Sequence, residues 1–584
     1  MNAFDYLVLL VTLLGIAGFG MWRTRQRRDL SAYLRGAGDA RWFTIGLSVM
    51  ATQASAITFL STPGQGYESG IGFVQNYFGA PLALIVIAIF FLPMYRRLNV
   101  YTAYEFLGRR FDQKTRLLGA ALFLLQRGIG AGITIYAPAI VLSTVFGWSL
   151  NLTIISSGLL VVIYTVAGGS DAVSLTQKYQ IGVIFAGMIT AFFVLLAKLP
   201  ANLTLPDALA VAGGFHKLRA VDFSLDPDRL YTFWSGLLGG MFLALSYFGT
   251  DQSQVQRYFA GASLRESRLG LMFNAVCKIP MQFFILLLGA LVFVLYQFEP
   301  PPVFFNQTTW QYHAEHGAGE KLRVLAGDFA LAHEQERRQL HAWLDARHAG
   351  DRPAADTALA GALAAHARTQ AARTATKAVL RAADARAPTN DSDYVFITFV
   401  LHYLPHGLIG LLVTVFFAAA LNSKAAELNA LGSTTTIDLY RHLLKRDATD
   451  AHYVAASRCF IVLWGLVAIA FALGVSLTEN LIQWANIIGS IFYGMPLGLF
   501  LVAFFLRRIG GSAVFWGGLA AQALIFGIYF LRHVVPIFNI SYLWYNVIGC
   551  AGCVLFSGIL QAALRSNGED GTLGPAARPG PLLP

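Results

Sequence analysis

Stretches of about 20 apolar residues recur along almost the whole of this 584-residue chain, from Asp5 to the neighbourhood of Leu564. A helix of roughly that length is needed to cross a bilayer core about 30 Å thick. The composition agrees, because 56% of the residues are hydrophobic and only 13% are charged, a balance that water-soluble domains do not carry. The pattern predicts thirteen membrane-spanning helices, at approximately 5–22, 42–64, 76–97, 117–146, 150–168, 176–199, 231–254, 270–297, 394–421, 455–476, 480–506, 512–531 and 541–564.

The formal charge of +11 does not indicate nucleic-acid binding, because the basic residues lie in short loops between apolar stretches. Every second loop is basic, whereas loops such as 65–75 and 477–480 contain almost no Lys or Arg. The positive-inside rule therefore predicts a bacterial inner-membrane protein with a periplasmic N-terminus and a cytoplasmic C-terminus. The basic residues are Arg23, Arg25, Arg27, Arg28, Arg35, Arg96, Arg97, Arg109, Arg110, Arg257, Arg265, Arg268, Arg441, Lys445, Arg446, Arg507 and Arg508.

Residues 298–393 interrupt the membrane pattern with a polar segment rich in Ala, Arg, Asp and His. Strong helix formers dominate Asp328–His348 and Asp356–Ala387, so we expect a periplasmic helical hairpin. Its charged faces are typical of solvated helices, and partner binding is the alternative. The expected organisation is 1–297 in the membrane, 298–393 as the insertion, 394–565 in the membrane and 566–584 as a disordered cytoplasmic tail.

Two predicted spans have interrupted interiors. Leu47–Gly66 is crowded with small and hydroxyl residues, and Gly236–Gln256 contains glycines and a polar end. Broken helices at matching places in two halves indicate a midplane binding site in transporters that are built from inverted repeats. Spans two to six and seven to eleven would be those halves. Close helix packing through small residues is the alternative explanation.

At these segments the chain resembles the sodium/solute symporter family, and most of all its monocarboxylate, vitamin and sialic acid carriers. The likeness covers the chain from the first span to about residue 510. It implies an all-α LeuT-type fold, with a five-plus-five inverted repeat, one helix before it and two after it. The motifs are SVMATQASAITFLSTPGQGY at 48–67, YTAYEFLGRRF at 101–111, GGSDAV at 168–173, GTDQSQVQRYFA at 249–260 and FFAAALNSKAAELNALGSTTTIDLY at 416–440.

The resemblance implies a sodium site between the first and eighth core helices. Oxygen ligands suit a hard cation, and an unwound helix supplies them without a carboxylate. Carried over by motif, the ligands are the carbonyls of Ala51, Ala54 and Ala419 with the side chains of Asn422 and Ser423. Asn422 departs from the family's usual serine, but its amide oxygen can also coordinate sodium.

A second sodium site, found in some family members, lacks its anionic and hydroxyl oxygen ligands in this sequence. The corresponding positions are Gln177, Ala425 and Ala426, so we expect one sodium ion per cycle. Lysines stand beside both regions, at Lys178 and Lys424. A buried ammonium in place of the cation would make transport proton-linked or uncoupled.

We prefer the simpler interpretation of Lys424, in which it pairs with Glu427 three residues later on the same helix.

Two charged residues lie deep inside predicted spans, where a charge is costly and marks a candidate functional position. Arg127 is on the third core helix, and Lys278 is on the seventh. In the family these helices line the substrate cavity, and sialic acid carriers bind a carboxylate with an arginine on the third. Arg127 resembles that arginine, and a guanidinium matches a carboxylate bidentately. A pairing of Arg127 within the bundle is the alternative.

The remaining predicted substrate residues come from the same likeness. Where sugar carriers of the family place a glutamate and an asparagine, this chain has Tyr77 and Ala244, which reduces its capacity to bind a neutral hexose. Tyr247 and Phe248 correspond to the aromatic inner gate, and Asp251 is expected at the cytoplasmic end, bound to basic loop residues. The predicted substrate-binding residues are Gln53, Ser55, Thr58, Asn76, Tyr77, Arg127, Tyr247, Phe248 and Lys278.

The sequence therefore predicts a monomeric, sodium-coupled importer of a small organic solute, expected to be a carboxylate, that works by alternating access. A transporter-like membrane sensor is the alternative from another class, but no signalling module follows residue 565. An enzyme is not expected, because the spans contain no paired carboxylates, metal-ligand spacing or nucleophile motif. The expected partners are the solute, sodium and the lipid bilayer, and not nucleic acid.

Overall fold

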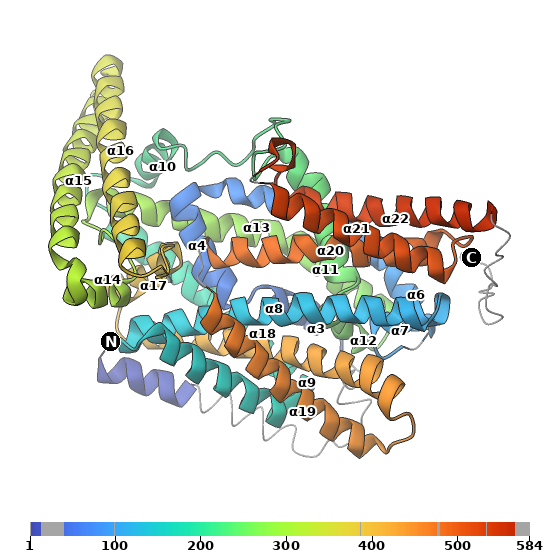
Figure 1. Cartoon of the computed structure of the whole chain (residues 1–584). Helices are drawn as coiled ribbons and strands as arrows, with labels where there is room; N and C mark the ends of the chain where they lie inside the picture. Colours follow the sequence, from blue (N-terminus) through green and yellow to red (C-terminus); the bar gives the residue numbers. More distant parts are fainter. Residues whose placement is uncertain are drawn as a thin grey trace.

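The computed structural model describes residues 2–12, 40–98, 100–385, 387–475, 479–532 and 534–566 (Figure 1). Side chains at 98, 167–180, 415, 418, 421, 422, 565 and 566 lie outside this description although their backbone is helical. Several sequence predictions fall outside it as well: the arginines at 23–35, the GGSDAV motif, Gln177, Lys178 and the tail from residue 567. Within the described residues the secondary structure is helical and no β-strand occurs.

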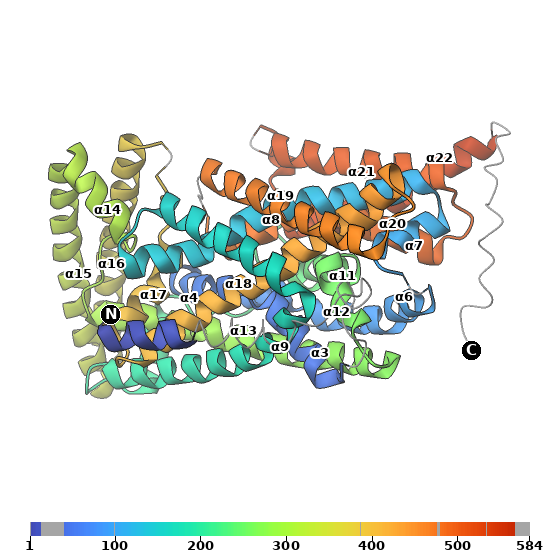
Figure 2. The same ribbon diagram turned by 90° about the horizontal axis from the view of Figure 1, so that it is seen from below.

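The bundle of long helices runs between a polar hairpin at one end and the end of α22 (Leu543–Ser566) at the other, as both ribbon views show (Figures 1 and 2). The first half contains a helix at Ala3–Thr12, then α3 (Trp42–Gln53), α4 (Ala56–Ser69), η1 (Ile71–Tyr77), α5 (Ala80–Val86), η2 (Ile87–Phe91), α6 (Leu92–Leu98), α7 (Ala103–Arg110), α8 (Gln113–Phe146), α9 (Leu150–Lys198), α10 (Leu205–Gly214), η3 (Ser235–Gly239), α11 (Gly240–Gly249), α12 (Gln252–Phe259) and α13 (Leu264–Phe298). The second half contains α14 (Gln307–His313), η4 (Ala314–Ala318), α15 (Gly319–His348), α16 (Arg352–Ala383), α17 (Ser392–Tyr403), α18 (Leu408–Thr434), η5 (Thr435–Leu444), α19 (Asp450–Gly474), α20 (Leu481–Phe505), α21 (Gly511–Leu531), η6 (Pro536–Phe538) and α22 (Leu543–Ser566).

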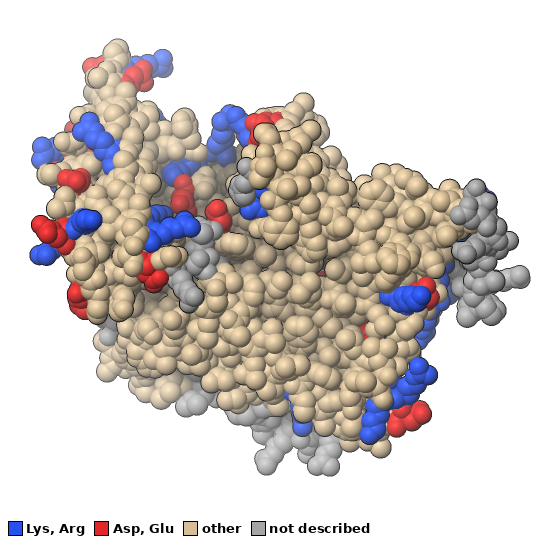
Figure 3. All heavy atoms as spheres, viewed as in Figure 1, with Lys and Arg blue, Asp and Glu red and all other residues tan. Residues whose placement is uncertain are grey.

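Among the described residues, eight helices are long and apolar enough to cross a bilayer, or nine when the bent pair α3–α4 counts as one span. Three shorter apolar helices, Ala3–Thr12, Leu150–Val166 and Ser235–Gly249, coincide with further predicted spans. Figure 3 shows charged side chains on the hairpin and at the opposite end, with a broad uncharged surface between them. The chain is thus a multi-pass membrane protein, and the total of thirteen spans stays a prediction.

One predicted span has wrong boundaries. The sequence suggests a single helix at 394–421, but the structure ends α17 at Tyr403 and begins α18 at Leu408. Gly407 adopts a positive φ of 88° between them, which an L side chain rarely adopts, and Pro405 precedes it. The eighth core helix is therefore α18, and it extends beyond the predicted span to Thr434.

Both predicted helix interruptions are present. The axes of α3 and α4 differ by 58°, and Ala54 leaves the helical region between them with φ −85° and ψ 67°. The second interruption separates α11 from α12 at Thr250 and Asp251, and Asp251 has extended backbone angles. Its carboxylate caps α12 by accepting hydrogen bonds from the Ser253 amide (2.9 Å) and hydroxyl (2.6 Å).

Glycines hold α4, the second half of the first broken helix, against its neighbour α13. A Cβ atom at Gly66 would lie 2.3 Å from the Leu286 carbonyl oxygen, and one at Gly289 would lie 2.0 Å from the Pro63 carbonyl oxygen. Such contact leaves no room for any side chain, which is how small residues let membrane helices approach. The broken helix α3–α4 and α13 consequently pack as one unit around the central cavity.

The insertion contains a long antiparallel pair, α15 and α16, joined by a short turn at Ala349–Asp351. Both helices begin several residues earlier than the sequence suggests. The segment that leads from α16 into α17 carries Asp391, which is 1% exposed. Its carboxylate accepts bonds from the Phe305 amide (2.7 Å), Arg373 (2.8 Å) and Lys377 (3.1 Å), and this hairpin anchor ties the insertion to the bundle.

Candidate functional site

A central cavity of about 130 Å³ lies between the two helix interruptions. Its walls come from the first interruption, from η1, α8, α11 and α13, and from the middle of α18 and α20. All nine predicted substrate residues line it: Gln53, Ser55, Thr58, Asn76, Tyr77, Arg127, Tyr247, Phe248 and Lys278. Ala244, at the position that carries an asparagine in sugar carriers, also lines the cavity. The structure thus brings these residues together, and their contact with a solute stays a prediction.

Lys278 presents an unbalanced positive charge to this cavity. Its side chain comes from the middle of α13 and is 2% exposed. Its ammonium lies 4.8 Å from the centre of the Tyr77 ring, a cation–π contact. No carboxylate of the described residues pairs with it. A buried ammonium is costly without a countercharge.

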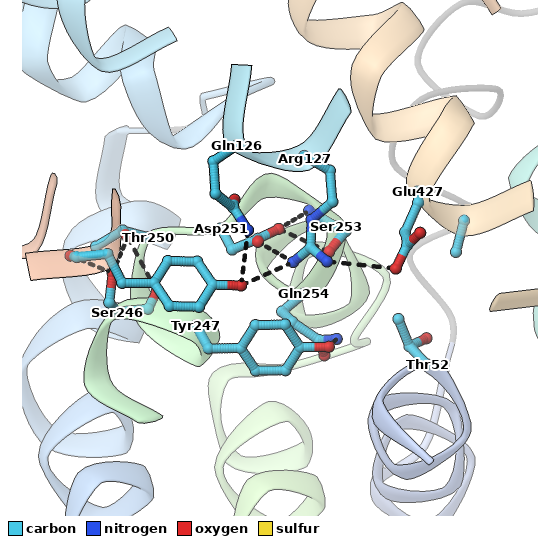
Figure 4. Close-up of polar contacts among 12 residues, drawn as sticks. Thr52, Gln126, Arg127, Ser246, Tyr247, Thr250, Asp251, Ser253, Gln254 and Glu427 are labelled. Carbon is cyan, nitrogen blue, oxygen red and sulfur yellow. Dashed lines mark hydrogen bonds and ion pairs between the residues drawn. The ribbon is translucent and has the colours of Figure 1, made fainter. Parts of the chain in front are cut away.

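Arg127, in contrast, already has two carboxylate partners (Figure 4). Its guanidinium contacts Asp251 closely and lies 3.3 Å from Glu427. It also donates to the Tyr493 hydroxyl at 3.3 Å and lies 5.4 Å from the Tyr247 ring centre. The alternative that Arg127 pairs within the bundle is therefore present in the structure, while one edge of its side chain still lines the cavity.

The expectation for Asp251 is wrong. It does not lie at the cytoplasmic surface with basic loop residues, but is 2% exposed and contacts Arg127 from the gap between α11 and α12. A carboxylate in that gap caps the following helix and neutralises a buried guanidinium at the same time. The sequence motif GTDQ resembles a polar helix end, and the structure places that end inside the bundle.

The preferred pairing of Lys424 with Glu427 is confirmed, since the two side chains are in direct contact on α18. Both are buried, at 2% and 6% exposed. The Glu427 carboxylate also accepts a hydrogen bond from the Thr134 hydroxyl at 3.3 Å. Lys424, Glu427, Arg127 and Asp251 therefore form one continuous chain of ion pairs beside the cavity, here called the ion-pair chain.

The predicted sodium ligands surround the first helix interruption. Ala51 lies in the last turn of α3 and Ala54 follows that helix, where the Ala54 amide donates to the Met50 carbonyl and the regular helical hydrogen bonding ends. From α18, the Ser423 hydroxyl donates to the Thr52 carbonyl at 3.3 Å, so α18 touches the interruption. Ala419 is one turn away on α18, and the side chain of Asn422 lies outside the described residues. The donor set consists of neutral oxygens, as a monovalent hard cation requires.

The predicted gate residues Tyr247 and Phe248 lie on α11, and Arg127 of the ion-pair chain lies over the Tyr247 ring. The ring centres of Tyr247 and Tyr493 are 6.0 Å apart, and Gln254 donates to the Tyr247 hydroxyl at 2.7 Å. Tyr493, on α20, was not among the predicted residues. It accepts a hydrogen bond from Gln126 at 3.2 Å, and Ser246 donates to its carbonyl at 2.7 Å. The Gly and Pro residues of the segment YGMPLG, beginning at Tyr493, are the only sequence signal that marks this place.

Three comparisons agree on the kind of protein to which this chain is similar. A family model described as the sodium:solute symporter family matches residues 33–305 and 370–521. The chain is 33% identical to the human sodium/iodide cotransporter over 279 residues, which are 47% of this chain and 43% of that protein. It is 22% identical to the human sodium-coupled monocarboxylate transporter 2 over 618 residues, which cover 97% of this chain and 85% of that protein.

A solved structure shares the fold. It is described as the substrate-bound outward-open state of a Na⁺-coupled sialic acid symporter, and it matches with a TM-score of 0.71 at 22% identity. The match covers 96% of this chain and 98% of that one. The two chains therefore have the same all-helical architecture, the LeuT-type fold that the sequence predicts.

Proposed function

The chain belongs to the sodium:solute symporter family, and from this membership we propose that it imports a small organic anion, a carboxylate, together with sodium. A member of this family is a membrane transporter and not an enzyme. Sodium is accordingly a transported partner, and its gradient supplies the energy for uptake.

The single observation that carries the anionic assignment is Lys278. Its ammonium is buried in the wall of the central cavity, and no carboxylate among the described residues compensates it. A solute carboxylate would supply the missing charge and would bind through a charge-assisted hydrogen bond. Asn76, Gln53 and Tyr77 line the same cavity and would orient the rest of the molecule. Arg127 is a second contact for the carboxylate, through the edge that faces the cavity.

We assign sodium to the oxygens at the first helix interruption: the carbonyls of Ala51, Ala54 and Ala419 and the side chains of Asn422 and Ser423. This site joins α3 to α18, so a bound cation would hold the two helices together. An ion can shift the equilibrium only through its different affinity for the two states. Sodium would favour the outward-open state, the solute would then bind, and movement of α3–α4 and α11–α12 would release both inside. One sodium with one monoanion makes the cycle electroneutral.

The orientation proposed is a periplasmic N-terminus and hairpin and a cytoplasmic C-terminus. The hairpin and the helix Ala3–Thr12 lie at one end of the bundle, and α22 ends at the other (Figure 1). Arg507 and Arg508 follow α20, and Arg96 and Arg97 end α6, toward the end of the bundle at which α22 ends. The positive-inside rule assigns that end to the cytoplasm.

The test begins with the purified full-length protein, screened for thermal stabilisation by small carboxylates in sodium and in potassium. The best stabiliser is then used as the labelled solute in vesicles with an inward gradient of either ion. We expect the wild-type protein to take up the solute only in the sodium gradient. We expect the Lys278→Gln variant to show no uptake in either gradient. Lys217→Gln is the matched control, because Lys217 donates to the Glu68 carbonyl at 2.6 Å and does not line the central cavity. Equal uptake in potassium would contradict the sodium assignment, and unchanged uptake by Lys278→Gln would contradict the anionic one.

A proton-linked carrier is the second candidate, and Lys424 is the observation that favours it. Its buried ammonium stands beside Ser423 and binds Glu427, so the charge of this pair could change by a proton in place of sodium. Uptake driven by a pH gradient in vesicles without sodium would support this candidate. Uptake that needs sodium and ignores the pH gradient would exclude it.

A further inference from the structure

The ion-pair chain spans the distance between the two helix interruptions. At one end, Ser423 of α18 touches the first interruption through the Thr52 carbonyl, and Lys424 follows it directly. At the other end, Asp251 occupies the second interruption. Glu427 and Arg127 join these ends across α18 and α8. Figure 4 shows Arg127 between Asp251 and Glu427, with Thr52 on the neighbouring helix.

The four charges balance one another. Two cations and two carboxylates are buried together, with exposures of 6% for Arg127, 2% for Asp251, 6% for Glu427 and 2% for Lys424. Charges in such a place are tolerated only when they are compensated. Removal of one charged side chain therefore leaves a net charge whose sign is known in advance. Because its surroundings have low polarity, this charge interacts strongly with other charges nearby.

We propose that Asp251, Glu427 and Lys424, together with Arg127, are positioning residues that link the sodium site to the second helix interruption. The closed ion-pair chain holds the α11–α12 gap against α8 and keeps the inner side shut. It is neutral in that state, so it does not oppose a cation at the oxygens near Ser423. This link rests on the proposed sodium site.

Opening of the inner side follows from the same geometry. When the α11–α12 gap moves away from α8, Asp251 leaves Arg127. The part that stays behind, Arg127, Glu427 and Lys424, then carries one net positive charge beside the sodium site. Like charges repel, so sodium binds less tightly once the gate is open. Gate opening and sodium release thus become one event, without any direct contact between Asp251 and the ion.

The sign of the effect makes the proposal testable without knowledge of the solute. The probe is radioactive sodium, bound at equilibrium to the purified full-length protein in detergent. Asp251→Asn and Glu427→Gln each leave a net positive charge, so we expect sodium affinity to fall at least about fivefold. Arg127→Gln and Lys424→Gln each leave a net negative charge, so we expect it to rise by a similar factor. The double variant Arg127→Gln with Asp251→Asn is neutral again and should return close to the wild-type affinity.

A merely structural role would not give this pattern, because damage to the fold weakens sodium binding whatever the sign of the lost charge. Asp391→Asn is the matched control, since it removes a buried carboxylate from an arginine at the hairpin anchor and should leave sodium affinity unchanged. If Arg127→Gln does not fold, Lys424→Gln tests the same sign. The link would be overturned if all four single variants bound sodium more weakly than the wild type, or if the double variant bound it more weakly than both of its single variants. Either result would leave the proposed sodium site intact. A wild-type protein that binds no sodium would overturn the proposed function, and the link with it.

Discussion

Two buried clusters of ions in this molecule have nearly the same chemistry and different surroundings. The hairpin anchor joins Asp391 to Arg373 and Lys377, and the ion-pair chain joins Asp251 and Glu427 to Arg127 and Lys424. The anchor connects the insertion to the helices beside it, and the Phe305 amide donates a further hydrogen bond to the Asp391 carboxylate. The ion-pair chain connects two helix interruptions and borders a cavity.

The difference teaches that the strength of a buried ion pair does not reveal its role. An anchor holds two parts together most firmly when water cannot replace its partners. Asp391 meets this condition because it is buried. The ion-pair chain is proposed to connect parts that move, so its contacts have to break in each transport cycle. Its side chains therefore need partners from which they can separate. The family model matches residues 33–305 and 370–521, so it leaves out most of the hairpin but includes the residues of both clusters.

The largest effect is expected in the ion-pair chain. Arg127→Met leaves Asp251 and Glu427 with Lys424 as their only cation, and removal of one partner from a buried pair costs about 3–5 kcal/mol. Chemical unfolding of the purified protein in detergent should show this loss. Asp251→Asn added to Arg127→Met should recover part of it, because an unpaired carboxylate is removed. A loss below about 1 kcal/mol would show that solvent already screens these charges.

The hairpin anchor should respond less to the same change. In Arg373→Met, Asp391 keeps Lys377 at 3.1 Å and the Phe305 amide at 2.7 Å, so we expect a loss of about 1–3 kcal/mol. Hydrogen exchange should accelerate in α15 and α16 and not in α8 or α18. Sodium binding should match that of the wild type. A changed sodium affinity would erase the distinction between the two clusters.

Acid should affect the anchor next. Burial alone would raise the pKa of Asp391, but Arg373 and Lys377 outweigh it and hold this pKa below its usual value. The carboxylate therefore stabilises the folded state at every pH above about 4, its value in an unfolded chain, and this contribution disappears as the pH falls through the lower folded value. The protection of the hairpin amides, meaning their exchange rate relative to the intrinsic rate at the same pH, should stay constant from pH 7 to about 4 and fall below that. In Asp391→Asn the hairpin should be less protected from exchange at all these pH values. Its protection should then show no further change as the pH falls below about 4.

The smallest effect belongs to the exposed face of the hairpin. Glu334 pairs with Arg337 at 2.7 Å and with Arg338 at 2.9 Å, and all three side chains are in contact with solvent. Exposed pairs contribute little to stability because water and salt screen them. Glu334→Gln should leave the melting temperature and sodium binding unchanged. A clear fall in either one would indicate that this face packs against something that the isolated chain does not show.

Much of the architecture was accessible from local sequence patterns. Apolar length predicts the long helices, and small and hydroxyl residues around Ala54 predict the first interruption. Arg127 and Lys278 were singled out as charges inside predicted spans and the other seven cavity residues through the likeness to a known family, and all nine line the cavity. The boundary between α17 and α18 was missed although Pro405 and Gly407 mark it, because apolar residues on both sides conceal a break when only hydropathy is considered.

The partners of Arg127 were not accessible in this way. Asp251 and Glu427 are separated from it by 124 and 300 positions in the sequence, so no helical spacing connects them. Only the fold brings the α11–α12 gap and the middle of α18 to α8. Lys424 and Glu427 show the opposite case, since their spacing of three residues within one helix was sufficient to predict the contact.

The rigid hairpin also has a practical consequence. Helical membrane proteins are difficult to align in electron micrographs, because a detergent belt hides most of their shape. Here α15 and α16 form a polar helix pair that lies across one end of the bundle, crosswise to the long helices, as both ribbon views show (Figures 1 and 2). An antibody fragment raised against its tip would bind outside the belt and far from the cavity, and would mark the orientation of each particle throughout the transport cycle.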